Sequence, residues 1–495
     1  MSEPVEATPA GLRRIAIDPL SRVEGHGKVT LLLDDAGRVH QVRLHIVEFR
    51  GFERFIEGRP YWEVPVMVQR LCGICPVSHH LAASKALDRV IGVAELPRTA
   101  ELVRRLMHYG QILQSHALHF YHLSSPDLLF GFGSDPAQRN VVGLAAAYPE
   151  LAKQGILLRK LGQQIIEVTA GKRIHGTGSV PGGVNRSVGV EDRQRLLAAV
   201  PSALEWAKAG VALIAKLHEE HAAQYASFGT VPSNLLSLVR RDGALDLYDG
   251  VLRVRDAEGA IVIDGLDPQR YRERLKEEVR SWSYMKFPFV ESLGVDRGWY
   301  KVGPLARVQN CDFIDTPEAE AARQAWRARS GGALVHAPLA YHWARMIELL
   351  HAVEVVERLL GDEALSGTEL ASSGAHTGEG VGILEAPRGT LIHHYKVDAQ
   401  DLVTMCNLIV STTHNNQAMN ESIAAVAHEY LDGEEPTEAL LNHIEVAIRA
   451  FDPCLSCATH ALGKMPLVVE TIDRAGAVVG RLQRNSDGTF ERGER

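Results

Sequence analysis

Cysteine is scarce in this chain, and positive charge is not in excess. Only six of the 495 residues are cysteine, too few for a disulfide scaffold, and C-x-x-C pairs in a reducing compartment more often bind metal or carry out redox chemistry. The 53 Lys and Arg residues are outnumbered by 61 Asp and Glu, so the formal net charge is −8. We therefore expect no nucleic-acid partner and no attraction to an anionic membrane.

Long uncharged apolar runs are missing as well. No such run approaches the roughly 20 residues that span a bilayer, and the N-terminal sequence lacks the apolar stretch of a signal peptide. We accordingly expect a cytoplasmic protein without a membrane span. Hydrophobic residues at 45% and charged residues at 23% are ordinary for a globular protein. The length allows several domains or one large intertwined unit.

The expected secondary structure is mixed α and β, predominantly helical in the middle of the chain. Apolar and polar residues alternate around turn residues in three stretches that predict β-hairpins: 28–47, 250–264 and 467–480. Apolar residues recur at a spacing of three to four in the stretches that predict long helices: 99–124, 138–170, 192–227, 338–361 and 437–450. The pattern predicts long central helices with peripheral hairpins.

Four of the six cysteines form two C-x-x-C pairs at opposite ends of the chain. The first pair lies in RLCGICPVSHH, residues 70–80, and the second in DPCLSCATH, residues 452–460. A helix over 78–92, with Ser78 as N-cap, is predicted to follow the first pair, and a helix over 438–451 to stop just before the second. Because the positive N-terminal end of a helix lowers the pKa of a nearby thiol, the first pair is suited to metal binding, and we treat both pairs as plausible metal ligands. Cys311 and Cys406 stand alone, and we expect both to be small buried hydrophobes.

Spacing alone leaves the identity of the metal open. Four thiolates commonly form a structural zinc site. In zinc ribbons, however, about 15–20 residues separate the two pairs, whereas 379 positions separate Cys75 from Cys454 here. Soft thiolate ligands also suit nickel and iron centres, and an iron–sulfur cluster is a third option.

The residues around both pairs resemble those of the nickel-iron hydrogenase large subunit. That family carries R-x-C-G-x-C-x-x-x-H near its start and D-P-C-x-x-C-x-x-H near its end, and both motifs are present here. Three further family blocks follow the family order: DPLSRVEGHG (18–27), EFRGFERF (48–55) and EAPRGTLIHHY (385–395). The resemblance covers essentially the whole chain and implies a single intertwined unit over 1–495, with a flexible N-terminus at 1–12. A related subunit of the respiratory complex keeps the fold but lacks the four cysteines.

The resemblance assigns a role to each cysteine. Cys72 and Cys454 would be terminal nickel ligands, while Cys75 and Cys457 would bridge nickel to an iron that carries carbon monoxide and cyanide. His79 would hydrogen-bond or orient a cysteine sulfur. Without the motif, a histidine four residues after a cysteine is as often on a helix surface.

Heterolytic cleavage of H2 releases a proton that needs a nearby base. Glu24, in RVEGHG, matches the family's first proton acceptor beyond the nickel-bound thiolate, here Cys454. Arg388, in EAPRG, matches the arginine placed over the open metal position, where a guanidinium can polarise the substrate and donate to cyanide. Outside these motifs, both would be read as solvated surface residues.

Three further roles follow from the resemblance. Glu53 and His460 match ligands of a nearby structural divalent ion, usually magnesium, joined by a backbone carbonyl near Leu408. Thr412, in IVSTTHN, matches the residue whose hydroxyl hydrogen-bonds a cyanide, with one residue of slippage left open. Asp452 would support the region around the arginine.

One helix departs from the pattern of the periplasmic members. Their Asp-His-x-x-His-Phe-Tyr motif reads Ser115-His116-Ala117-Leu118-His119-Phe120-Tyr121 here, so the aspartate near the active-site arginine is missing. The histidines on this helix could also form a haem-binding face: His108, His116, His119 and His122. Packed or hydrogen-bonded histidines are the commoner explanation, and no haem motif accompanies them.

Several blocks resemble the cytoplasmic, bidirectional hydrogenases coupled to NAD(P): CPVSHHLAASKALD, WSYMKFPF and DPCLSCATHALG. The alternative is a similar group that passes electrons to a ferredoxin or heterodisulfide-reductase partner without binding a nicotinamide, and SHALHFYHLSSPD favours that group. Two unassigned cysteines cannot hold an iron–sulfur cluster, so the expected partner is an iron–sulfur small subunit. No G-x-G-x-x-G fingerprint is present, so NAD and FMN are expected on diaphorase subunits.

The resemblance also implies processing of the C-terminus. In this family a maturation protease cuts after the last histidine of the second motif once nickel-insertion proteins have loaded the metal. The cut would fall between His460 and Ala461 and remove residues 461–495. The alternative is an ordinary C-terminal hairpin.

Overall fold

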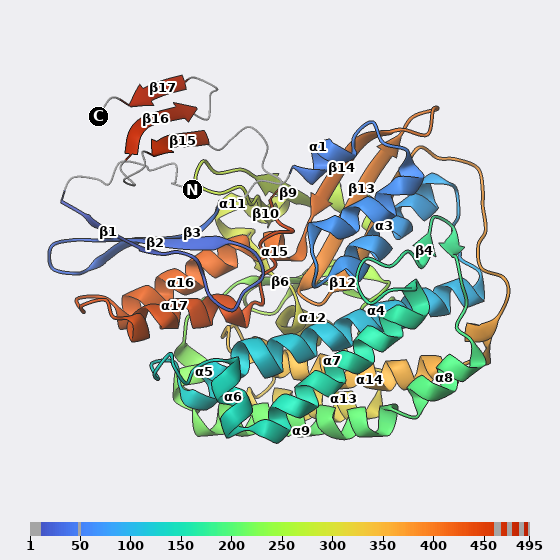
Figure 1. Cartoon of the computed structure of the whole chain (residues 1–495), viewed down its shortest axis with the longest axis horizontal. Coiled ribbons are helices and arrows are strands. Elements are labelled where there is room, and N and C mark those ends of the chain that lie inside the picture. The colour runs from blue at the N-terminus through green and yellow to red at the C-terminus, as the bar shows by residue number, and fades with distance from the viewer. Residues whose placement is uncertain (1–10, 48–50, 460–466, 473–477, 485–489, 494–495) are drawn as a thin grey trace.

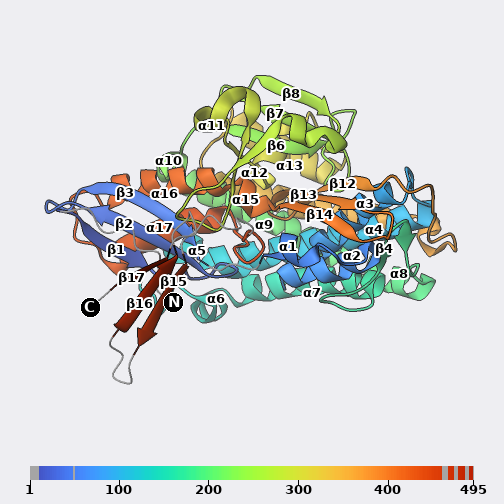
Figure 2. The ribbon, with the colours of Figure 1, turned by 90° about the horizontal axis from the view of Figure 1, so that it is seen from above.

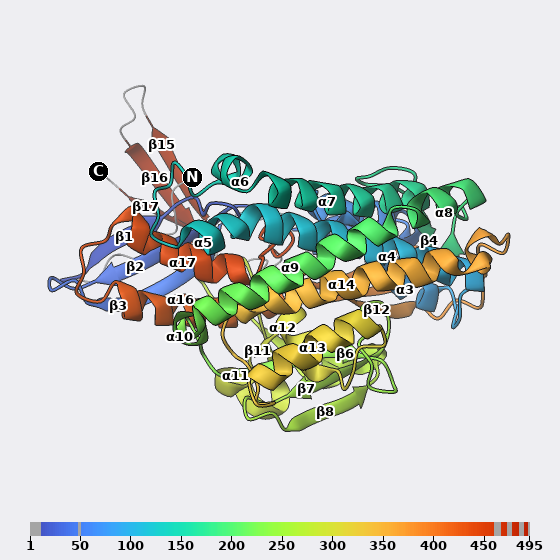
Figure 3. The ribbon, with the colours of Figure 1, turned by 90° about the horizontal axis from the view of Figure 1, so that it is seen from below.

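The computed structural model describes residues 11–47, 51–459, 467–472, 478–484 and 490–493. It is a mixed α and β structure in which long helices lie side by side and sheets cover their flanks (Figures 1 and 3). The largest hydrophobic cluster takes residues from Leu20 near the N-terminus to Ala458 near the second cysteine pair. The predicted class, a predominantly helical mixed fold, is confirmed.

Four long helices form the helical layer: α4 (Arg98–Leu118), α7 (Pro149–Ala170), α9 (Val200–Glu220) and α14 (Ala340–Gly361). Close packing of α4 on α7 depends on two glycines, because a Cβ on Gly162 would lie 2.6 Å from the Gly110 carbonyl oxygen. The shorter helices around them are α5 (Ser125–Phe130), α6 (Val141–Ala147), α8 (Val190–Leu197), α10 (Ala222–Ser227), α12 (Pro304–Asn310) and α13 (Pro317–Arg329).

The predicted helices exist but several are interrupted. The 99–124 helix is α4 followed by a π-helical segment, His119–Ser124. The 138–170 helix is α6 and α7, because Pro149 starts a new helix. The 192–227 helix is divided into α8, α9 and α10, with Pro201 in the first turn of α9. The 338–361 and 437–450 predictions are confirmed as α14 and α17 (Glu438–Ala450).

Within the described residues, one stretch is long and apolar enough to cross a membrane by length and composition alone. It is Val190–Glu220, which spans α8 and α9. A single such stretch is weak evidence for a membrane span, and α9 packs along α14 in the helical layer (Figure 3).

An N-terminal sheet packs on two C-terminal helices. Strands β1 (Arg13–Ile17), β2 (Gly27–Leu33) and β3 (Val39–Ile46) are antiparallel, so the predicted 28–47 hairpin is confirmed with one additional strand. The sheet lies beside α16 (Asn416–Tyr430) and α17 (Figure 1). The N-terminus of the described chain is therefore brought close to the segment that follows α17.

A central antiparallel sheet carries helix α3 (Pro76–Val90) on one face. Its strands are β12 (Glu379–Ala386), β13 (Gly389–Val397) and β14 (Val403–Ile409). Gly380 and Gly382 allow the close contact, because a Cβ on either would lie 2.1 Å from a carbonyl oxygen of α3. Helix α3 begins two residues earlier than predicted, with Cys75 at the N-cap. The prediction of Ser78 as N-cap is wrong, because Pro76 is suited to the first helical position.

The remaining elements are short. The β7–β8 pair confirms the predicted 250–264 hairpin, within a sheet of order β11-β6-β7-β8. Its strands are β6 (Asn234–Val239), β7 (Val251–Arg255), β8 (Ile261–Leu266) and β11 (Tyr300–Lys301). The other strand pairs are β4 (Ser179–Val180) with β5 (Gly183–Val184) and β9 (Leu275–Glu278) with β10 (Phe287–Val290). Short helices are α1 (Phe52–Ile56), α2 (Val64–Met67), α11 (Gly294–Arg297) and α15 (Ser411–His414). Short 3-10 helices are η1 (Tyr61–Glu63), η2 (Val68–Leu71), η4 (Pro268–Glu273), η5 (Glu291–Leu293) and η6 (Glu363–Ser366).

The C-terminal strands form their own antiparallel sheet: β15 (Leu467–Ile472), β16 (Val478–Arg484) and β17 (Phe490–Gly493). The predicted hairpin at 467–480 is confirmed as part of it. The sheet lies on the side of the molecule that carries β1–β3 (Figures 1 and 2). Residues 1–10 and 460–466 lie outside the described residues, so the predicted flexible N-terminus at 1–12 stays a prediction.

Candidate metal centre

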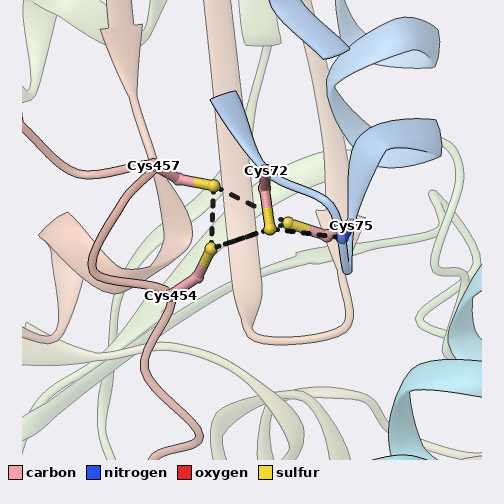
Figure 4. Close-up of side chains that lie close together, drawn as sticks. All are labelled: Cys72, Cys75, Cys454 and Cys457. Atoms are coloured by element: carbon pink, nitrogen blue, oxygen red, sulfur yellow. Dashed lines mark hydrogen bonds between the residues drawn. The ribbon is translucent and has the colours of Figure 1, made fainter. Parts of the chain in front are cut away.

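Four buried cysteine sulfurs meet at one point in the structure (Figure 4). Cys72 follows η2, Cys75 caps α3, and Cys454 and Cys457 lie in the turn after α17. Their sulfur atoms all lie within 4.8 Å of one another, and they are the group of possible metal ligands found in the described part of the chain. The Cys75 sulfur is 3.8 Å from both Cys454 and Cys457. The predicted convergence of the two pairs is confirmed.

The second pair is held in place by the N-terminal segment. Helix α17 ends at Ala450, Asp452 has a left-handed backbone (φ 54°), and Pro453 prevents continuation of the helix. The Leu455 N–H then donates to the backbone oxygen of Glu24 at 3.0 Å. Gly25 makes this contact possible, since its φ is 82° and a Cβ there would lie 2.6 Å from the Ser456 nitrogen.

The local electrostatics favour a thiolate at Cys72. Hydrogen bonds from the neighbouring thiols, together with the charge of Arg388, hold the pKa of Cys72 well below its usual value despite burial. The Ile74 N–H also donates to the Cys72 sulfur at 3.2 Å. Four thiols that are this close cannot all ionise without a cation, and a bound metal supplies that positive charge.

A small cavity opens beside the sulfurs, and Arg388 forms part of its wall. The cavity is lined by Cys75, Cys454, Ser78, His79, Ala386, Pro387, Arg388, Leu391, Val410, Ser411 and Thr412. Arg388 Nη2 donates to Asp452 Oδ1 at 3.1 Å, whereas its buried Nε and Nη1 have no hydrogen-bond partner among the described residues. Burial disfavours the guanidinium charge, but Asp452 and the cysteines outweigh burial and hold the Arg388 pKa well above its usual range.

These features fit a nickel-iron centre better than a structural zinc ion. Four sulfurs alone would suit either metal. A zinc ion bound by four cysteines is coordinatively complete and needs no adjoining cavity. The unsatisfied N–H groups of Arg388 instead require an acceptor in the cavity, and cyanide on an iron would provide one.

Glu24 lies where a base for the site would be useful. Its Oε2 accepts a hydrogen bond from the Ser456 N–H at 3.1 Å. The side chain is partly buried, and burial raises the Glu24 pKa, while hydrogen bonds from Cys454 and Ser456 oppose that shift. Glu24 thus interacts with the Cys454 thiol and has a raised pKa, which favours proton uptake, while its role as the proton acceptor stays a prediction.

Glu53 and Leu408, two of the predicted ligands of a divalent ion, lie close together, but the contact uses the Leu408 N–H and not its carbonyl, so the ion site stays a prediction. The Leu408 N–H donates to Glu53 Oε1 at 2.8 Å. Lys286 Nζ also donates to Glu53 at 3.1 Å and lies 3.4 Å from Glu277 Oε1. Lys286 and Glu277 were not anticipated from the sequence, although WSYMKFPF contains the lysine. The third predicted ligand, His460, lies outside the described residues, as does Ala461.

The remaining predicted residues surround the cysteines. The Cys454 N–H donates to Thr412 Oγ1 at 2.8 Å, which leaves the hydroxyl proton of Thr412 available to the cavity. His79 lines the cavity and its Nδ1 hydrogen-bonds with His393 Nε2 at 3.1 Å. His393 in turn contacts the Tyr395 hydroxyl at 2.7 Å. Asp452 supports Arg388 as predicted.

The histidines of α4 and the π-helical segment after it, where the sequence departs from the periplasmic members, have separate protein partners. His108 donates to the Leu247 carbonyl at 2.8 Å, His116 pairs with Glu348 at 3.0 Å, and His119 donates to the Arg449 carbonyl at 2.7 Å. Their separate partners favour the packed explanation over a haem-binding face, and the fourth, His122, is not part of a metal-ligand group in the described residues. Ser115 is fully buried where the periplasmic members have aspartate. The two isolated cysteines are buried hydrophobes as expected, and burial raises the pKa of Cys311 to about 12.

Comparison with known proteins identifies the family. Residues 50–130 and 247–460 match the family described as nickel-dependent hydrogenase, and residues 14–49 match one described as HoxL-like. The chain therefore belongs to the nickel-dependent hydrogenases.

Two sequence relatives and two structures make the comparison more specific. The NAD-reducing hydrogenase HoxS subunit beta of Cupriavidus necator is 47% identical, over 95% of this chain and 100% of that protein. One chain of the vhc hydrogenase of Methanococcus voltae is 40% identical, over 92% of this chain and 97% of that one. A crystal structure of an NAD⁺-reducing NiFe-hydrogenase in the H2-reduced state superposes with a TM-score of 0.89 at 62% identity, covering 90% of this chain and 99% of that one. The Ni-Fe-Se hydrogenase of D. vulgaris Hildenborough shares the fold at 24% identity and a TM-score of 0.73, covering 91% and 100%.

Proposed function

We propose that this chain is the catalytic subunit of an NAD-reducing nickel-iron hydrogenase, which cleaves H2 reversibly and passes the electrons through a partner subunit to NAD(P). The observation that carries the proposal is the convergence of four sulfurs from opposite ends of the chain beside the cavity that Arg388 lines. The greater identity to the NAD-reducing relative than to the methanogen protein favours NAD(P) over the ferredoxin or heterodisulfide-reductase alternative.

The four cysteines would hold the metals, all four as nickel ligands and Cys75 and Cys457 also as iron ligands. When bound, the centre would supply Lewis-acidic metal that polarises H2. Arg388 donates to groups in the cavity through Nε and Nη1, and Thr412 donates through its hydroxyl. Arg388 keeps its positive charge throughout, because Asp452 and the thiolates hold its pKa high.

Glu24 would receive the proton that the cleavage releases. The carboxylate interacts with Cys454, and burial raises its pKa above the usual value of a glutamate, which makes it a better proton acceptor. Ser456 fixes the carboxylate through the backbone N–H at 3.1 Å. Glu53, the Leu408 backbone and His460 would bind magnesium near the site, with Lys286 as a neighbouring charge.

Electrons would leave through the exposed surface next to the first cysteine pair. Gly73 lies between the first two cysteines and is exposed, as is Arg70. Arg70 Nη1 donates to His175 Nδ1 at 2.7 Å, and His175 Nε2 donates to the Cys72 carbonyl at 3.3 Å. Next to His175, Ile174 is 48% exposed. This surface suits the iron–sulfur small subunit, whose clusters would accept the electrons, while FMN and NAD would bind diaphorase subunits.

The proposal also includes a cytoplasmic location and a maturation step. A protease would cut between His460 and Ala461 after nickel-insertion proteins have delivered the metal, and the cut would remove β15–β17.

Metal analysis and infrared spectroscopy of the purified complex test the function. We expect nickel and non-haem iron, bands of metal-bound carbon monoxide and cyanide, and H2-dependent reduction of NAD(P). Stoichiometric zinc without such bands would refute the metal assignment. H2 uptake with an artificial dye but without nicotinamide reduction in the full complex would refute only the acceptor.

A further inference from the structure

A second cavity, which none of the four cysteines lines, is lined by several positively charged side chains. It encloses about 330 Å³ between α3, α4, η4, β12 and the loops around β6 and β7. This volume is at the lower end of the range of small-molecule sites. The cationic side chains that line it are Lys85, Arg89, Arg105, Arg240 and Arg241.

Three carboxylates also line the cavity, but each already has partners. Asp246 accepts from Arg105 at 2.9 Å and from two backbone N–H groups. Asp249 pairs with Lys85 at 3.2 Å, and Asp267 accepts the Gln269 N–H at 2.9 Å. Among the cations, Lys85 and Arg105 pair with these carboxylates, and Arg240 pairs with Asp242 and Asp315 outside the lining, so two of the five cations have no carboxylate partner among the described residues.

The two cations without a carboxylate partner are both arginines. Arg89, near the end of α3, and Arg241, after β6, are exposed at the cavity, and their side chains make no hydrogen bond or ion pair with any residue in the described ranges. Their guanidinium groups approach the cavity from different elements. Two unpaired guanidinium groups at one cavity are suited to bind an anion with several oxygens, and a phosphate group has that geometry.

We propose that this cavity binds a small phosphate-bearing anion, gripped by Arg89 and Arg241. The lining also includes Val381, Ile383 and Pro268, apolar side chains against which the organic part of a phosphate monoester can pack. The cavity shares α3 and β12 with the metal centre, since α3 begins at the Cys75 cap and β12 leads into Arg388. The site is separate from the proposed H2 chemistry and does not depend on it.

Calorimetric titration of the intact hydrogenase complex in phosphate-free, low-salt buffer tests this proposal, with inorganic phosphate, adenosine 5′-monophosphate and citrate as three separate probes. We expect saturable binding of both phosphate probes at one site per large subunit, weaker binding of citrate, and weaker binding of all three at higher ionic strength. Tighter binding of the nucleotide than of phosphate would identify the organic part as a component of the ligand.

The test variant is the double substitution Arg89→Gln and Arg241→Gln. Both side chains are exposed and lack protein partners among the described residues, so the variant should fold and keep its basal H2 uptake. Losing two charged donors should raise the dissociation constant for phosphate at least about tenfold. A matched control replaces Arg195 and Arg329, two exposed arginines that do not line the cavity, and should bind as the wild type does.

Three results would overturn the proposal: no saturable binding to the wild-type complex, unchanged binding to the Arg89 and Arg241 variant, or citrate binding as tightly as the phosphates. None of them would affect the proposed hydrogenase function, whose evidence is the metal content and the NAD(P) reduction.

Discussion

Replacing Glu24 by Gln should separate proton transfer from metal binding. In the wild type, Glu24 Oε2 accepts the Ser456 N–H at 3.1 Å and the Glu24 backbone oxygen accepts the Leu455 N–H at 3.0 Å. Glutamine keeps a side-chain oxygen for the first hydrogen bond and the same backbone for the second. The turn that carries Cys454 and Cys457 should therefore retain its position, and the four sulfur ligands are untouched.

The substitution replaces the basic carboxylate that interacts with the Cys454 thiol by a neutral amide. A positioned acid–base group typically contributes about 10²–10⁴-fold to a rate. We therefore expect H2 uptake, and exchange of dihydrogen with solvent deuterium, to fall by about two orders of magnitude or more, equivalent to about 2.7 kcal/mol of barrier. Isotope exchange followed by mass spectrometry measures the effect, with nickel, iron and the cyanide bands quantified in the same sample.

The control is Glu205→Gln, at an exposed position of α9, which should leave every readout unchanged. If the Glu24→Gln variant holds full nickel and exchanges isotopes at the wild-type rate, Glu24 does not carry the proton. Another route, such as one through Arg388 and its solvent, would then be required.

Three further predictions concern assembly, processing and pH. Cys75→Ser or Cys457→Ser should abolish incorporation of nickel and iron, while Cys406→Ser at a buried position without a predicted ligand role should not; full metal content in either ligand variant would contradict the bridging assignment. Active enzyme from the native host should have the intact mass of a chain ending at His460, and an active full-length subunit would rule out obligatory processing. His218 has its pKa lowered from 6.5 to about 4 by burial, so the unfolded state binds the proton first and stability should fall as the pH drops from 6.5 toward 4. His218→Phe should reduce the loss of unfolding free energy between pH 7.5 and 5.5 by about 1 kcal/mol in denaturant titrations, and an identical loss in both proteins would contradict this.

Local patterns predicted the elements well where a single signal determined them. Alternation around Asp34–Gly37 marked the β2–β3 hairpin, and the Asp452-Pro453 step marked the end of α17. The interruptions within the predicted 138–170 and 192–227 helices were missed, because the apolar spacing continues across Pro149 and Pro201 even though each proline starts a new helix. The N-cap of α3 was also misplaced at a proline, because Pro76 competes with Ser78 as the signal for the start of the helix.

The composition of the site could be predicted from its motifs, but its surroundings could not. Motif residues such as Arg388 and Asp452 meet as expected, at 3.1 Å. Lys286 lies far from Glu53 in the sequence, and its ion pair with Glu53 depends on how the segment just before β10 is placed beside α1. No local pattern encodes that placement. The same holds for the pairing of His79 with His393, which joins α3 to β13.

The position of the ligands along the chain has a consequence for how the site forms. Cys72 and Cys75 can be placed as soon as α3 packs on β12 and β13, whereas Cys454 and Cys457 need α17 to dock and the loop at Glu24 and Gly25 to close over them. The two halves of the ligand set close a loop of 379 positions, and such a long loop is entropically costly to fix without a cross-link. A metal bound to all four sulfurs acts as that cross-link and stabilises the closed form. Metal insertion is therefore expected to precede final closure of the C-terminal segment, which agrees with the proposed order of nickel delivery before cleavage after His460.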